Sequence, residues 1–136
     1  MKLDLDVIRD ILLFLEDEIT VDNNGTVYGA SVDDIANHFQ GKYEKGQIIY
    51  TCRRLEEGEY ITGRFDYASG KLYYSFISAI TYQGHEFLNL IRDETTWGKT
   101  KKAAGKIGSF AISVITDIAK QIITGAITAF ISGAPQ

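Results

Sequence analysis

The chain of 136 residues has a single cysteine, Cys52, and only two histidines, His38 and His85. One cysteine cannot form an internal disulfide framework, and a lone thiol fits a reducing compartment. A structural zinc site usually takes four Cys or His ligands at short spacings, so metal binding has little support. We therefore expect neither a metal nor another cofactor.

Motifs that would name a reaction are also missing. The glycines beside Lys42 and Lys45 lack P-loop spacing, and no G-x-S-x-G elbow is present. We interpret His85, which follows Gly84, as a partly buried helix residue rather than a general base, and Cys52 as a core residue. We expect a protein without enzymatic activity, and a small hydrolase with an unrecognised site is the weakest alternative.

Basic residues are scarce in the first third of the chain. Residues 1–41 contain two Lys or Arg against nine Asp or Glu, whereas residues 42–106 contain eleven against eight. The acidic part would repel a phosphate backbone and the mildly basic middle could approach one, so charge neither excludes nor favours nucleic acid. The start, MKLDLDVIRD, carries carboxylates where a signal peptide needs an apolar core, and we expect a cytoplasmic protein.

Three helices are predicted in the first half. The hydrophobic fraction of 45% and charged fraction of 24% are those of an ordinary globular domain. Apolar residues at three- and four-residue spacing predict an amphipathic helix over 3–18. Capping residues and glycines predict a short helix over about 31–41 and a third over about 44–57.

In the next part of the chain the sequence pattern changes from helical spacing to runs of strand-forming residues. The run Asp22–Gly25 predicts a turn before a short strand at 27–28. Two strand-forming runs around a glycine turn predict a β-hairpin over 60–80. Thr81 is expected to cap another helix, with Phe87, Leu88 and Ile91 on its apolar side and Tyr82 as a further candidate for that side.

Helix, short strand, helix, helix, hairpin and helix is the order of a winged helix-turn-helix. We predict a mainly α fold with a small β-hairpin, in which residues 1–96 form a winged-helix domain. Residues 97–106 are then a basic connector, and residues 107–136 form a long apolar helix.

The C-terminal helix has more apolar surface than one neighbour would cover. Asp117 and Lys120 interrupt it near its middle, so we do not expect it to cross a membrane. A helix lying on a membrane usually has a lysine-rich polar face, and this one has serine and threonine. We predict homo-oligomerisation through this helix, and the alternative is packing against its own domain. The expected interface residues are Ile107, Phe110, Ala111, Val114, Ile115, Ile118, Ile122, Ile123, Ile127, Phe130 and Ile131.

DNA binding is the more specific alternative function for residues 1–96. The third helix and the hairpin would offer side chains suited to phosphates and base edges. Those residues are Lys45, Gln47, Tyr50, Thr51, Arg53 and Arg54 on the helix, with Arg64 and Lys71 on the hairpin. Acidic residues are interleaved with them, and the same scaffold often contacts proteins instead.

The segments KLDLDVIRDILLFLE, QIIYTCRRLEEGEYI and ITYQGHEFLNLIRDETTWGKTKK resemble a domain-of-unknown-function family from bacteria and their phages. The matching positions are Arg9, Leu12, Thr81, Gly84, His85, Glu86, Phe87, Leu88, Arg92, Asp93, Thr95, Trp97 and Lys99. The chain departs from that pattern where Gly58-Glu59-Tyr60-Ile61 replaces Ala-Gly-Leu-Ile. The resemblance implies a winged-helix protein encoded by a phage or prophage, and it brings no assigned activity or site.

These observations lead to two functional hypotheses. The first is a non-enzymatic interaction protein of a mobile element, which self-associates and binds a host or phage protein. The second is a DNA-binding transcriptional regulator that reads through residues 44–57 and the wing over 60–80.

Overall fold

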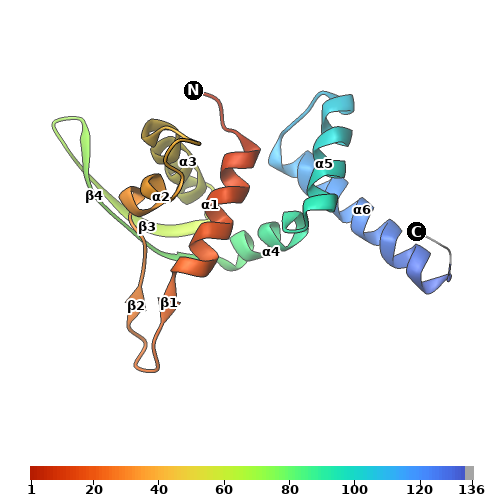
Figure 1. The fold of residues 1–136 in the computed structure, drawn as a ribbon, viewed down its shortest axis with the longest axis horizontal. Helices are drawn as coiled ribbons and strands as arrows, with labels where there is room; N and C mark the ends of the chain where they lie inside the picture. Colours follow the sequence, from red (N-terminus) through yellow and green to blue (C-terminus); the bar gives the residue numbers. More distant parts are fainter. Residues whose placement is uncertain (134–136) are drawn as a thin grey trace. The chain divides into compact units, whose positions relative to one another are not determined.

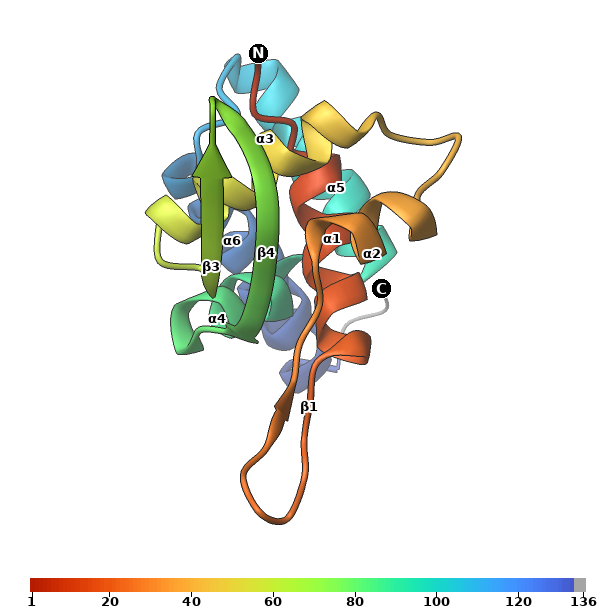
Figure 2. The ribbon, with the colours of Figure 1, turned by 90° about the vertical axis from the view of Figure 1, so that its left-hand side faces the viewer.

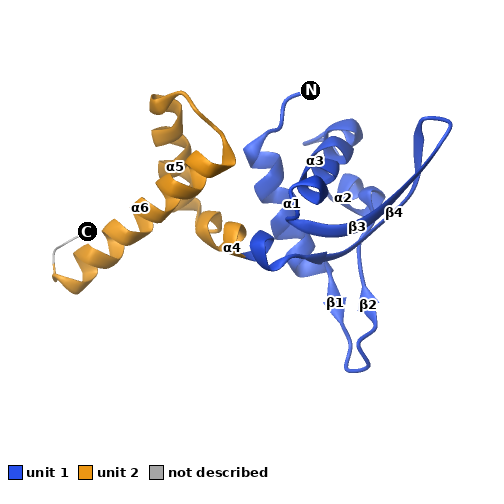
Figure 3. Ribbon diagram, turned by 180° about the vertical axis from the view of Figure 1, so that it is seen from behind, with its two compact units in different colours: residues 1–85 blue, residues 86–136 orange. Residues whose placement is uncertain are grey.

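The computed structural model describes residues 1–133. The fold is mainly helical, with two small antiparallel β-hairpins and a long apolar C-terminal helix (Figure 1). The chain divides into two compact units, residues 1–85 and residues 86–136 (Figure 3). The end of the predicted C-terminal helix, residues 134–136, lies outside the described residues.

Helix α1, Leu5–Glu18, confirms the predicted first helix. It begins after Asp4, whose carboxylate accepts a hydrogen bond from the N–H of Asp6 at 2.8 Å and so satisfies one free donor of the first turn. The apolar stripe is buried, as its spacing predicts. The buried residues are Leu5, Val7, Ile8, Ile11, Leu12 and Leu15.

A two-stranded hairpin follows α1. Strands β1, Thr20–Val21, and β2, Val27–Tyr28, pair antiparallel, and only β2 was predicted. The turn is held by Asp22, whose carboxylate accepts hydrogen bonds from the N–H groups of Thr26 and Asn24, both at 2.9 Å. These bonds hold the pKa of Asp22 below its ordinary value, the one from Thr26 most.

Helices α2, Val32–His38, and α3, Lys45–Glu57, confirm the second and third predicted helices. A reciprocal capping box starts α2: Ser31 Oγ accepts from the N–H of Asp34 at 3.1 Å, and the Asp34 carboxylate accepts from the N–H of Ser31 at 2.9 Å. Helix α3 packs against both α1 and α2.

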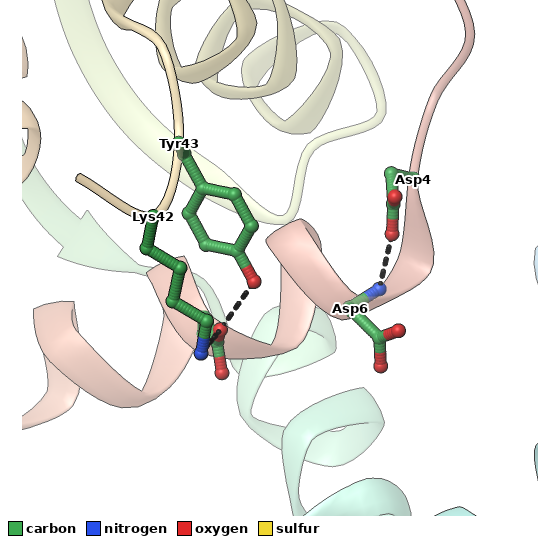
Figure 4. Close-up of polar contacts among 5 residues, drawn as sticks. Asp4, Asp6, Lys42 and Tyr43 are labelled. Atoms are coloured by element: carbon green, nitrogen blue, oxygen red, sulfur yellow. Dashed lines mark hydrogen bonds and ion pairs between the residues drawn. The ribbon is translucent and has the colours of Figure 1, made fainter. Parts of the chain in front are cut away.

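The loop between α2 and α3 is tied to α1 through Asp10. Tyr43 Oη donates to Asp10 Oδ2 at 2.5 Å, and Lys42 Nζ lies 3.0 Å from the same oxygen. Figure 4 shows the Tyr43 and Lys42 side chains lying side by side, with the dashed lines of their two contacts. Burial and the hydrogen bond to Asp10 raise the pKa of Tyr43, so the phenol keeps its proton well into the alkaline range.

Strands β3, Ile61–Ala68, and β4, Lys71–Ile80, form the predicted long hairpin (Figure 2). Ser69 and Gly70 close it with φ angles of 52° and 76°, the left-handed pair of a tight hairpin turn. The segment before α2 also pairs with β4 at one point, because Ala30 and Ile77 exchange backbone hydrogen bonds of 3.0 and 2.7 Å.

Helix α4, Tyr82–Ile91, begins where the sequence places it. Thr81 Oγ1 accepts a hydrogen bond from the N–H of Gly84 at 3.0 Å, which confirms Thr81 as the cap. Phe87, Leu88 and Ile91 are buried as expected. Two details were wrong: Tyr82 is 83% exposed, and His85 is exposed rather than partly buried, because both lie on the solvent side of the first turn.

The C-terminal part contains helices α5, Glu94–Ile107, and α6, Ile112–Ile131, which pack against each other. The expected basic connector over 97–106 is therefore helical, and the last helix starts at Ile112 instead of residue 107. The break falls at Gly108, whose φ of 83° ends α5. The apolar run continues through this glycine, so periodicity alone did not reveal the turn.

Candidate interaction site

Helix α3 has one fully buried side. Ile48, Cys52 and Leu55 lie in the core, which confirms Cys52 as a core residue. Burial raises the pKa of the Cys52 thiol to about 12, so the reactive thiolate is scarce at neutral pH. Thr51 is also buried, at 1% exposure, and its Oγ1 donates to the Gln47 carbonyl at 2.7 Å. The expectation that Thr51 faces a partner was wrong.

The other side of α3 reaches the surface together with the hairpin. Lys45 is exposed at the start of the helix, and Gln47, Tyr50, Arg53 and Arg54 are half-buried along it. On the hairpin, both predicted contact residues, Arg64 and Lys71, are exposed. Helix α3 packs on β3, so the structure brings much of the predicted set to one neighbourhood.

Two arginines of α3 lie on aromatic rings. The Arg53 guanidinium is 5.1 Å from the ring centroid of Phe65 and 5.3 Å from that of Tyr67, so it bridges α3 to β3. The Arg54 guanidinium is 5.2 Å from the ring of Tyr50, one helical turn earlier. Such stacking orients the guanidinium groups and leaves them fewer free rotamers than surface lysines have.

Four of the cations predicted to contact DNA each pair with a carboxylate of their own unit. The pairs are Lys45–Asp33, Arg53–Glu56, Arg54–Glu57 and Arg64–Asp66, with N–O separations between 2.5 and 3.5 Å. The hydrogen bond that Arg64 Nε donates to the Asp66 carboxylate also raises the pKa of Arg64. A phosphate backbone would meet cations whose charge is already balanced, which weakens its attraction.

A cleft of about 390 Å³ opens on this face. Its walls combine arginine stems with aromatic and apolar side chains, and they come from α3, the hairpin and the N-terminus. The lining residues are Met1, Gly46, Ile49, Tyr50, Arg53, Arg54 and Tyr67. Within the described chain, Arg54 Nε is buried without a hydrogen-bond partner. We call these seven residues the α3–β3 cleft.

The histidines do not gather other ligands. His38 is exposed, and its ring lies 4.6 Å from Phe14 and 4.7 Å from Phe39 between centroids, in an aromatic cluster. Among residues 1–133, no group of three or more His, Cys, Asp or Glu side chains could hold a metal ion.

The residues predicted for self-association separate into three groups. Ile115 is completely buried within the chain and cannot meet a second copy. Val114, Ile118, Ile122 and Ile123 are half-buried. The exposed residues lie at the two ends of α6: Ile107, Phe110 and Ala111 before it, and Ile127, Phe130 and Ile131 in its last turns.

Helix α6 is the one helix within residues 1–133 that is long and apolar enough to cross a membrane, judged by length and composition alone. Its mean hydropathy over the best window is 1.4, and 11% of that window is buried. Asp117 and Lys120 are both exposed on it.

A family model described as hypothetical protein (DUF2513) matches residues 2–111. This span covers most of the chain and ends one residue before α6. It confirms the resemblance to a family of unknown function that the sequence motifs indicated. No curated protein and no solved structure matches the chain.

Proposed function

We propose that this chain, which belongs to the DUF2513 family of hypothetical proteins, is a non-enzymatic winged-helix interaction protein. In this proposal a protein partner docks on the α3–β3 cleft, and copies of the chain associate through the C-terminal end of α6. The phage or prophage origin implied by the sequence resemblance makes a bacterial host protein the first partner to seek.

The winged-helix assignment is supported by the order of the elements in residues 1–85. Helices α1, α2 and α3 precede a long hairpin that serves as the wing. The Ala30–Ile77 bridge pairs the segment between α1 and α2 with β4, so a third stretch of chain lies beside the hairpin at this point. In a helix-turn-helix of this kind, α3 is the helix that presents side chains to a partner.

The observation that favours a protein partner over DNA is the internal pairing of the cations. Arg53 and Arg54 are held by Glu56 and Glu57, yet they remain at the wall of a cleft that also contains Tyr50 and Tyr67. Tyrosine and arginine around an apolar centre are the residues that dominate protein–protein interfaces.

DNA binding is the second candidate. It is favoured by the exposed cations of the wing, Arg64 and Lys71, which lie on the same hairpin that flanks α3. Under this alternative, phosphate contacts would come from the wing and base contacts from α3.

The two candidates are separated by the same variants in two assays. In a pull-down from the native bacterial host, Tyr67→Ala should lower recovery of the partner roughly thirty-fold, as expected for truncation of a central interface residue. Lys71→Gln should leave recovery unchanged, and Tyr73→Ala serves as the matched control because Tyr73 is 67% exposed on β4 and does not line the cleft.

A DNA regulator gives the opposite pattern. Its affinity for a duplex should fall steeply with added salt, and Arg53→Ala, Arg54→Ala or Lys71→Gln should weaken it. Salt-sensitive duplex binding that responds to Lys71→Gln, together with partner recovery indifferent to Tyr67→Ala, would replace our proposal with the regulator.

A further inference from the structure

The turn between α5 and α6 exposes two large apolar side chains beside lysines. Gly108 ends α5, and its N–H and that of Ser109 donate to the Ala104 carbonyl at 2.8 and 3.1 Å, so the turn is well ordered by its backbone. On either side of Gly108, Ile107 is 65% and Phe110 is 54% exposed. We call residues 106–111 the α5–α6 tip.

Positive charge is concentrated next to this tip. Residues 95–116 contain four lysines and no acidic residue. Lys99, Lys102 and Lys106 are spaced by three and four positions, so they share one side of α5, and all three are exposed. Lys101 is placed differently, with its Nζ 5.4 Å from the ring centroid of Trp97.

The two units of the chain carry opposite net charge. Residues 1–85 hold 8 basic and 14 acidic residues, a net charge of −6, whereas residues 86–136 hold 6 and 4, a net charge of +2. The basic surface is therefore specific to the helical pair α5–α6, while the rest of the chain is acidic.

The polar stripe of α6 is serine and threonine, which by itself argues against membrane contact. The structure supplies the missing feature from the neighbouring helix, since the lysine-bearing α5 packs against α6. Lysines flanking exposed isoleucine and phenylalanine are the composition with which peripheral proteins bind anionic bilayers.

We propose that the α5–α6 tip binds an anionic phospholipid surface. Ile107 and Phe110 enter at the level of the headgroups, and Lys99, Lys102 and Lys106 contact the phosphates. This placement leaves Asp117 and Lys120 of α6 in water, where a helix crossing the bilayer would have to bury both.

Charge and exposure argue against the other occupants of this surface. A second copy would bring the same lysines against the tip, and like charges repel. A nucleic acid would meet the lysines equally well, but it gains little from an aliphatic side chain as exposed as Ile107.

The test is flotation of the full chain with vesicles of phosphatidylcholine alone and of phosphatidylcholine mixed with phosphatidylglycerol. Binding is expected only to the mixed vesicles, and it should fall as salt is raised. The double variant Lys102→Gln/Lys106→Gln should weaken the partition coefficient by roughly five-fold per lysine. Ile107→Ser/Phe110→Ser should abolish detectable binding, and thermal unfolding checks that both variants keep the fold.

The matched control is Tyr73→Ser/Tyr82→Ser, which removes two aromatic residues that are 67% and 83% exposed and lie outside α5, α6 and the α3–β3 cleft. This variant should bind the mixed vesicles as the parent does. The proposal is overturned by equal binding to both vesicle types, by absence of binding, or by loss of binding only in the control variant. The proposal would also be overturned, in favour of nucleic acid, by duplex DNA whose binding depends on Lys102 and Lys106 and is unchanged in Ile107→Ser/Phe110→Ser.

Discussion

Gly84 of α4 lies directly against the backbone carbonyl of Tyr60. A Cβ at position 84 would come within 2.1 Å of that oxygen and 2.7 Å of Ile80 Cγ2. Thr81 stabilises this contact with two hydrogen bonds. Its N–H donates to the Tyr60 carbonyl at 3.0 Å, and its hydroxyl donates to the Glu59 carbonyl at 2.6 Å. The glycine of the TYQGHEFL segment is thus explained by close packing of a helix on the entry to the hairpin.

Replacing Gly84 with alanine should destabilise the protein. The added methyl group meets backbone, which cannot move aside as a flexible side chain would, so we expect a loss of about 1–3 kcal/mol in the free energy of unfolding. The measurement is urea unfolding followed by circular dichroism.

Gly98→Ala is the control, because Gly98 is an exposed helical glycine of α5 and the position that a new methyl group would take has no neighbouring atom within 4 Å. The substitution should stabilise the protein by about 0.5–1 kcal/mol through helix propensity. Equal effects of the two substitutions would show that the contact with Tyr60 is unimportant.

The bond between Tyr43 and Asp10 should make stability sensitive to alkaline pH. Tyr43 has a raised pKa in the folded protein, so between the ordinary tyrosine pKa of about 10 and the raised value the folded state binds more protons than the unfolded state. The stabilisation is therefore complete below about pH 10 and declines as the pH rises above it.

Tyr43→Phe tests this dependence. At pH 7 it should cost roughly 1–2 kcal/mol, because the Asp10 carboxylate loses a hydrogen bond. Above pH 10 the difference between parent and variant should shrink. Tyr28→Phe is the matched control, since the Tyr28 hydroxyl makes only a 3.4 Å exposed contact with Asp22. A parent–variant difference that is constant from pH 7 to about pH 11 contradicts this account.

Cys52 should resist thiol reagents in the native protein. The side chain is fully buried and its pKa is raised to about 12, so both access and thiolate are lacking at pH 8. We expect no labelling by iodoacetamide under native conditions and one equivalent in urea. Rapid native labelling would mean that α3 separates from the core on the time scale of the reaction.

Elements with strong local signals were predictable from sequence. The helices over 3–18 and 44–57 combine apolar periodicity with capping residues or a terminal glycine, and the long hairpin combines β-branched and aromatic runs with a glycine turn. The structure reproduces them within about two residues. Strand β1 was missed because two residues carry no period of their own, and it exists only through pairing with β2.

The candidate site was less accessible to sequence reasoning. Thr51 stands three residues after Ile48 and four before Leu55, so helical spacing already places it on the buried stripe. The prediction was misled by its polar hydroxyl, which bonds the helix backbone instead of a partner. The stacking of Arg53 on Tyr67 depends on β3 lying beside α3, a contact between residues 14 positions apart that no local pattern encodes. The interleaved acidic residues indicated that some of the cations would be paired, but which four are paired required coordinates.

Self-association should depend on the C-terminal end of α6. Ile127, Phe130 and Ile131 are 53%, 80% and 77% exposed there, an unusual amount of apolar surface for one helix end. They adjoin a groove of about 520 Å³ between α5 and α6, with Ile122 and Ala126 on one wall. The groove wall also carries Asp93 and Lys99. The helix end of a second copy has no charge over its last eleven described residues in α6, so it brings no further charged group into the groove.

We therefore expect Ile127→Ser/Phe130→Ser to shift the full chain to a smaller assembly in light scattering. Ile107→Ser/Phe110→Ser should leave the assembly unchanged, because the tip lies at the opposite end of a helix roughly 30 Å long. Substitution is preferable to ending the chain at Lys102, since that cut falls inside α5 and would disturb the packing of α6. An unchanged mass for the Ile127→Ser/Phe130→Ser variant, or a parent chain that is already monomeric, would rule out this interface.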